Sequence, residues 1–245
     1  MKLLCNQCNK VDGNSKWLPI SIDNYSNIIA RKISLDERSY RYSLNKNICY
    51  NLQYLQYLVE CFDQIYLTSV LYTLNVKMFV IVAASIMEAI LYHEIIDKKL
   101  QNKSIWNLIK KIISNESKIK EEEIRLETHI FQKSIEKNEE MTFDQMLSKA
   151  ESKLLLGEDH DIYAKIKILR KLRNKVHLHL TDSRYDNDYA NFNFEQLDLA
   201  KKTLLDIFEI YFSLSEEEIN TVFSFLKIPI RIRSIQLLNI PTVSR

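Results

Sequence analysis

The sequence contains very little glycine and proline, with two glycines and three prolines among 245 residues. An all-β protein needs many tight turns, which these residues commonly occupy, so the composition argues against that class. Cysteine is also scarce, at four residues, and Met1–Cys5 is not followed by the long apolar segment of a secretory signal. Hydrophobic residues make up 46% of the chain, enough to bury a core. We therefore expect a mainly helical, cytoplasmic protein.

The sequence also lacks a strong overall charge and a long apolar run. The formal net charge of +2 does not by itself indicate a nucleic-acid partner. The most apolar run, Met78–Met87, is too short to span a bilayer and suits a buried core helix, so no membrane association is expected. Basic residues do cluster between Ala164 and Arg184, where Asp182 is the single acidic residue. Such a patch is compatible with phosphate binding or with an ordinary solvated helix face.

Apolar periodicity divides the chain into three parts. Residues 1–45 are polar and irregular and contain the only segments that we expect to form short strands. Residues 46–228 are predicted to form an antiparallel helical bundle, so the fold class is all-α, and residues 229–245 form an extended C-terminal arm. Capping boxes at Thr142/Gln145 and Ser215/Glu218 mark two helix starts. The helices are expected over 47–66, 76–100, 104–137 (one or two charged helices), 142–156, 159–179, 194–212 and from 215 to a point before Pro229.

The expected helix over 159–179 carries an unusual polar constellation. At 100° per residue, Arg170, Arg173, Asn174 and His177 fall within an arc of about 100°, whereas His179 points to the far side. Two cations, an amide and an imidazole on one face are the groups needed to bind and cleave a phosphodiester. The alternative is that these residues are only the polar face of an amphipathic helix. Their position beside the apolar stripe argues for partial shielding.

Glu88 lies within the most apolar expected helix. A carboxylate is costly to bury without a partner, so Glu88 should meet a cation or mark an opening in the core. The alternative is a position at a helix edge that faces solvent. A metal site has weaker support. Cys5 and Cys8 form half of a zinc knuckle without a second half, and His177 and His179 diverge on a helix, so we expect neither metal nor cofactor.

Taken together, these segments resemble the HEPN superfamily. The motif segment Leu169–His177 is similar to the family's arginine-to-histidine motif, Ala83–Leu91 to its central helix, and Met141–Leu147 to the capped helix before the motif. The resemblance covers roughly residues 47–213. It departs from the family pattern in spacing, because Arg173 and His177 are separated by three residues where the family has four to six. Arg170 with His177, or Arg173 with His179, fits that range, so the working pair stays open.

The resemblance implies a metal-independent endoribonuclease that acts as a homodimer, with toxin or defence roles and an antitoxin or regulatory protein among its partners. RNA supplies the nucleophile, its 2′-hydroxyl. The expected roles are general acid or base for His177, phosphate binding for Arg173 and Arg170, orientation by Asn174, arginine positioning by Glu88, a reserve catalytic role for His179, and RNA binding by Lys167, Lys171 and Lys175. The alternative is a non-catalytic module that binds RNA or protein, or a purely structural dimer.

Overall fold

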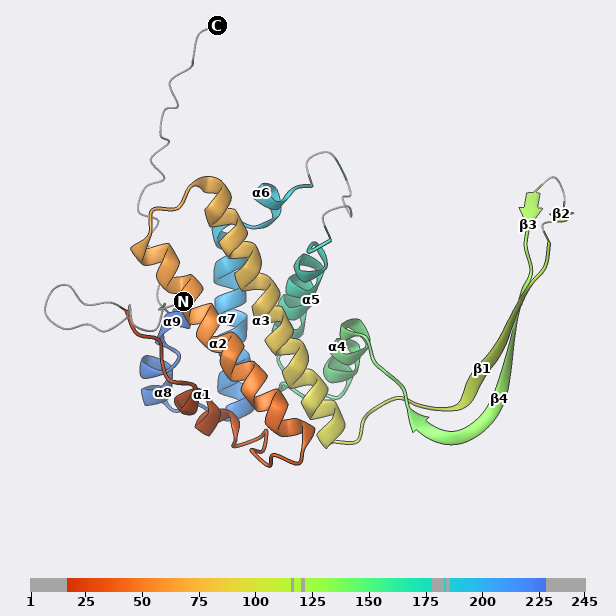
Figure 1. The fold of residues 1–245 in the computed structure, drawn as a ribbon, viewed down its shortest axis with the longest axis horizontal. Coiled ribbons are helices and arrows are strands. Elements are labelled where there is room, and N and C mark those ends of the chain that lie inside the picture. The colour runs from red at the N-terminus through yellow and green to blue at the C-terminus, as the bar shows by residue number, and fades with distance from the viewer. Residues whose placement is uncertain (1–16, 116, 120–121, 178–182, 184–185, 228–245) are drawn as a thin grey trace, which may run out of the picture.

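The computed structural model describes residues 17–115, 117–119, 122–177, 183 and 186–227. A helical bundle forms the body of the protein, and a long β-hairpin projects from it (Figure 1). The elements are α1 Ile22–Ile29, α2 Tyr40–Gln64, α3 Ser69–Asp97, β1 Lys103–Ile113, β2 Ser117–Ile119, β3 Glu122–Ile124, β4 Glu127–Asn138, α4 Phe143–Ser152, α5 His160–Asn174, α6 Asp188–Asn191, α7 Phe194–Phe212, α8 Glu216–Thr221 and α9 Ser224–Lys227.

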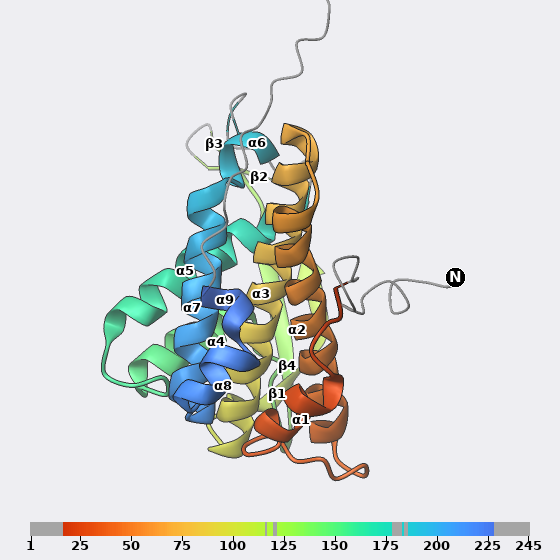
Figure 2. The same cartoon turned by 90° about the vertical axis from the view of Figure 1, so that its left-hand side faces the viewer.

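Helix α3 is the centre of the bundle. It packs against α2, α4, α5 and α7, as Figures 1 and 2 show from two sides. Apolar side chains cover most of its circumference, and Val76, Phe79, Ala83 and Ile90 are completely buried. By length and composition alone α3 is apolar enough to cross a membrane, but 56% of its most apolar window is buried inside the bundle. A buried core helix passes the same test, so this feature is weak support for a membrane span.

Several predicted helices are confirmed. Helix α7 has the expected bounds, and the capping boxes that open α4 and α8 are both present. In α5, Ile162, Ile166, Leu169 and Leu172 are buried, as the apolar stripe predicted. Helix α4 ends at Ser152, four residues earlier than expected. Gly157 does adopt a positive φ of 94°, but in the loop beyond the end of that helix.

Two expectations for the first 138 residues are wrong. Residues 17–45 were expected to be irregular with short strands, yet they contain α1 and the start of α2. The charged segment 104–137 was expected to be helical, yet it forms the antiparallel β1–β4 hairpin. β-Branched and aromatic residues favour strands, and this segment is rich in isoleucine. The fold is therefore mostly helical with a projecting hairpin, and not all-α. The predicted C-terminal arm, 229–245, lies outside the described residues.

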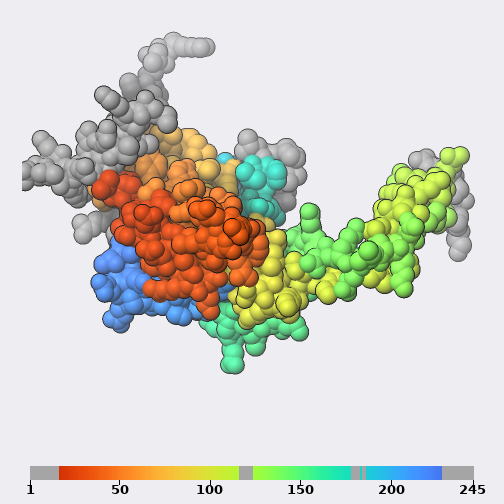
Figure 3. All heavy atoms as spheres, turned by 60° about the horizontal axis from the view of Figure 1, so that its bottom comes forward, coloured from red at the N-terminus to blue at the C-terminus, as the bar shows by residue number. Residues whose placement is uncertain are grey.

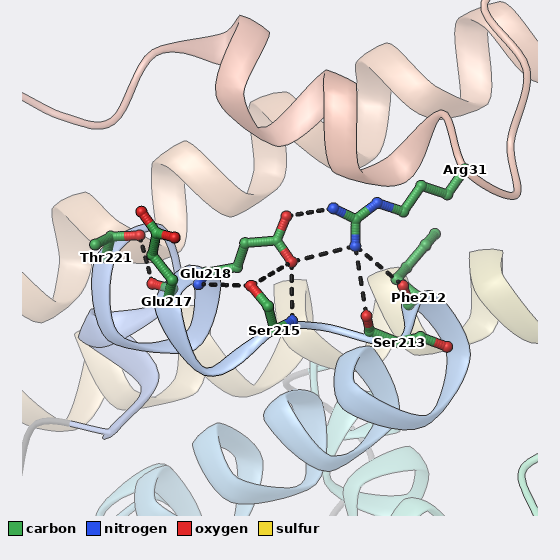
Figure 4. Close-up of polar contacts among 7 residues, drawn as sticks. All are labelled: Arg31, Phe212, Ser213, Ser215, Glu217, Glu218 and Thr221. Carbon is green, nitrogen blue, oxygen red and sulfur yellow. Dashed lines mark hydrogen bonds and ion pairs between the residues drawn. The ribbon is translucent and has the colours of Figure 1, made fainter.

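A polar cluster fastens the C-terminal helices to α1 (Figure 4). Helix α7 ends at Phe212, and its C-cap residue Ser213 has a left-handed φ of 52° that turns the chain toward α8. Arg31, which follows α1, forms an ion pair with Glu218 and also donates to the Phe212 and Ser213 carbonyl oxygens at 3.4 and 3.5 Å. Glu218 is in turn part of the capping box with Ser215. The Arg31 guanidinium thus donates to carbonyl oxygens at the end of α7 and also binds the carboxylate that caps the start of α8.

The buried His93 predicts a pH-dependent stability. Its Nδ1 lies 2.8 Å from the Tyr211 hydroxyl, and burial lowers the pKa of His93, with Arg41 lowering it further and Asp97 and Glu94 opposing both. The unfolded state, with an ordinary histidine pKa of about 6.5, binds the proton first as the pH falls. The part of the unfolding free energy that is linked to His93 should therefore be fully present well above pH 6.5 and should decline as the pH falls below that value. Urea unfolding between pH 5 and 7.5 should show this slope, and a His93→Gln variant with an unchanged slope would contradict it.

Candidate functional site

The candidate site lies at the C-terminal end of α5, where the helix packs on α3 and α4. Helix α5 begins after its N-cap Asp159 and ends at Asn174, five residues before the predicted end. The backbone N–H groups of Lys175 and Val176 donate to the Leu172 and Arg173 carbonyl oxygens, so the last turn tightens instead of continuing. The helix therefore stops before the histidine of the motif.

This early end corrects the predicted helical phase of His177. His177 lies in an exposed turn beyond α5, with its N–H 3.5 Å from the Asn174 carbonyl oxygen. Val176, which the apolar stripe placed in the core, is 45% exposed. The expectation that His177 is shielded on the α5 face is thus wrong. His177 is close in sequence to Arg173, but it is exposed in a turn and does not lie on the helix face. His179 lies outside the described residues.

Glu88 pairs with an arginine, as the sequence suggested, and the structure identifies that arginine as Arg173. The Arg173 Nη2 donates to Glu88 Oε2 at 3.1 Å, which joins α5 to α3. The two side chains are 37% and 25% exposed, so the pair is neither fully solvated nor fully buried. In such a setting the carboxylate fixes the direction of the guanidinium while other N–H donors remain available. The predicted alternative of a purely solvent-facing Glu88 is not observed.

Arg170 is held by a different carboxylate, one that the sequence did not indicate. Its Nη2 lies 2.9 Å from Asp144 Oδ1 in the first turn of α4, and its side chain is 21% exposed. Its Nε is buried and has no hydrogen-bond partner among the described residues. Asn174 is exposed at the last position of α5. Arg170 and Arg173 therefore reach two different helices, and both keep guanidinium nitrogens unused by these contacts.

The lysines predicted to bind RNA are mostly compensated within the chain. Lys167 lies 2.6 Å from Glu151, and Lys175 lies 2.5 Å from Asp186. Lys171 is exposed and has no ion pair with any residue that the structure describes. The acidic partners Glu151 and Asp186, like Asp144, could not be predicted from the sequence, because they lie outside α5 and reach these cations only in the folded chain. The end of α5 is thus a network of cations and carboxylates more than an open basic patch.

Side chains that could bind a metal lie apart from one another in the described part of the chain. No group of three or more His, Cys, Asp or Glu side chains is arranged there to hold an ion. Cys49 and Cys61 are both buried and free, and burial raises the pKa of each thiol, which disfavours the thiolate. Cys5 and Cys8 lie outside the described residues.

Searches with this chain matched no protein-family model, no curated protein and no solved structure.

Proposed function

We propose that the protein is a metal-independent endoribonuclease that uses the end of α5 as its active site. The observation that supports this most directly is the Arg173–Glu88 pair, which holds a guanidinium beside the exposed turn with His177. The fixed guanidinium provides donors for a phosphate, and the accessible imidazole provides proton transfer. The HEPN resemblance of the sequence points to the same residues. It also leads us to propose action as a homodimer, because the family's motifs act in pairs.

In the proposed reaction the RNA 2′-hydroxyl attacks the adjacent phosphorus and the bond to the 5′-oxygen breaks. His177 either accepts the 2′-proton or donates a proton to the leaving 5′-oxygen. Arg173, and Arg170 if it exchanges Asp144 for the substrate, stabilises the charge on the phosphate oxygens. Glu88 is a positioning residue for Arg173. The products are a 2′,3′-cyclic phosphate and a 5′-hydroxyl end, and no metal-activated water is required.

Single-stranded RNA should therefore be cut in the presence of EDTA, and DNA should not be cut. The sharpest substrate is an RNA oligonucleotide with one preferred cleavage position, compared with the same oligonucleotide carrying a single 2′-deoxynucleotide there. The substitution removes the nucleophile and leaves the rest of the chain available for binding, so cleavage at that position should stop. Mass spectrometry of the products should find the cyclic phosphate. Loss of activity in EDTA, or cleavage at the deoxynucleotide, would rule out this mechanism.

A non-catalytic binding module is the second candidate, and the ion pairs at Lys167 and Lys175 favour a protein over RNA as the molecule that it binds. Cations that are already neutralised gain less from a phosphate, because binding RNA must first break the in-chain pair. This alternative predicts a stable complex with RNA or protein and no cleavage. The same EDTA assay separates the two functions, since only the enzyme generates new 5′-hydroxyl ends.

A further inference from the structure

The β1–β4 hairpin carries a large amount of apolar surface that the bundle leaves uncovered. Figure 3 shows the hairpin as an arm separate from the body. Strands of eleven and twelve residues make it roughly 35 Å long. Exposed fractions of its large apolar side chains range from 36% to 90%, for Ile105, Trp106, Leu108, Ile109, Ile112, Ile113, Ile124, Leu126, Ile130, Phe131 and Ile135. Over both faces of the hairpin they sum to on the order of 1,000 Å², whereas a single stable interface buries about 800 Å² per partner.

Both faces of the hairpin share this apolar character. Directly paired residues lie on the same face, so one face combines Trp106, Leu108 and Phe131 with Lys133 and His129. The other face combines Ile130 and Ile112 with Lys110, Gln132 and Thr128. A two-stranded hairpin is only marginally stable when isolated in water, and further strands or packing are needed to support it. An arm of this composition is typical of a protein–protein contact.

The outer edge of β4 indicates which protein covers it. Among the described residues β4 pairs only with β1, so its second row of backbone N–H and C=O groups is unpaired. The sequence Glu127–Lys133 is self-complementary when two copies run antiparallel with Ile130 facing Ile130. The three flanking pairs are then a carboxylate with an ammonium, two polar side chains and two rings, namely Glu127 with Lys133, Thr128 with Gln132, and His129 with Phe131.

We infer that β4 pairs antiparallel with β4 of a second copy about a two-fold axis at Ile130, forming a four-stranded sheet in the order β1-β4-β4-β1. Such a contact is isologous, because the same edge of each copy meets itself. Lys133 makes no ion pair with any described residue, so the second copy's Glu127 supplies its missing partner. Glu127 already accepts from Lys111 and Arg125 of its own hairpin, and it gains a further cation at the rim. The inference does not depend on the ribonuclease proposal.

The test substitutes Ile130, which lies opposite Lys110 within the hairpin and opposite itself across the axis. Ile130→Glu places a carboxylate next to Lys110, which favours the hairpin, and next to a second carboxylate across the dimer, which disfavours the contact. The matched control is Ile112→Glu, at an isoleucine of β1 that lies on the same face and is 44% exposed, compared with 37% for Ile130. Sedimentation of the full chain at micromolar concentration should show a dimer for the wild type and Ile112→Glu. Ile130→Glu should raise the dimer Kd by about a hundredfold or more.

A cross-link provides a second readout that does not depend on dimer strength. Directly opposite residues in an antiparallel pair have Cα atoms about 4.5–5.5 Å apart, within the range of a disulfide. In a chain with Cys5 and Cys8 replaced by serine, Ile130→Cys should oxidise to a covalent dimer, whereas Ile112→Cys should not. A monomeric wild type, a dimer unaffected by Ile130→Glu, or equal cross-linking at both positions would each overturn the inference. Loss of the dimer with RNA cleavage intact would leave the cleavage chemistry at the end of α5 standing and would show that the β4 contact is not the homodimer proposed to act on RNA, so the two proposals can fail separately.

Discussion

Replacing His177 with alanine is expected to lower the rate of RNA cleavage by about 10² to 10⁴-fold, the usual contribution of a general acid or base. The turn beyond α5 exposes His177, so alanine removes no core packing and the folded stability should change little. The rate loss should appear in kcat, since the imidazole moves a proton and contributes less to RNA affinity. Single-turnover cleavage of an oligonucleotide in EDTA, with RNA binding measured in parallel, checks both parts.

Two comparisons make that result specific. His160→Ala changes an exposed histidine at the opposite end of the same helix and should leave the rate unchanged. Added imidazole should restore part of the activity of His177→Ala, because it can occupy the space that the side chain leaves and transfer the same proton. A wild-type rate in His177→Ala would remove this residue from the mechanism. His179→Ala then becomes the informative variant, because the sequence left it as the second candidate.

The bundle could be predicted from the sequence wherever apolar periodicity and caps agree. Helix α7 and the starts of α4 and α8 follow from local signals, because a capping residue acts through hydrogen bonds within a single turn. The hairpin could not be predicted as readily. Its many lysines and glutamates mimic a solvated helix, and strand pairing joins residues such as Lys103 and Asn138 that lie far apart in the sequence. Isoleucine enrichment was the signal that favoured strands.

The candidate site shows the same division between local and distant causes. The pairing of Glu88 with an arginine could be anticipated, because a carboxylate in an apolar helix needs a cation. The contact between Arg170 and Asp144 could not, because it depends on how α4 packs against α5. The end of α5 at Asn174 could not be predicted either, because the residues that follow include no glycine or proline, which commonly mark the end of a helix. Helical phase extrapolated beyond that point therefore placed His177 incorrectly.

Arg173→Ala is expected to reduce cleavage by roughly 10² to 10³-fold, similar to the loss of one donor that stabilises charge in a transition state. The variant removes the guanidinium and also leaves Glu88 partly buried without its partner. Arg173→Lys should recover only part of the rate, because an ammonium lacks the planar fork that matches two phosphate oxygens. Rates measured at saturating RNA separate this effect on the transition state from a loss of affinity.

A double variant decides whether Arg173 acts on the RNA or serves only as a counterion for Glu88. If the arginine merely neutralises the carboxylate, Glu88→Gln combined with Arg173→Ala removes both charges and should restore activity. If the guanidinium contacts the phosphate, the double variant stays as inactive as Arg173→Ala. The matched control is Arg41→Ala, which breaks a second arginine–carboxylate pair to α3, that with Asp97 at 2.7 Å, far from the motif. Full activity in Arg41→Ala and no rescue in the double variant together assign Arg173 to the phosphate, because only that role requires the guanidinium after its acidic partner is gone.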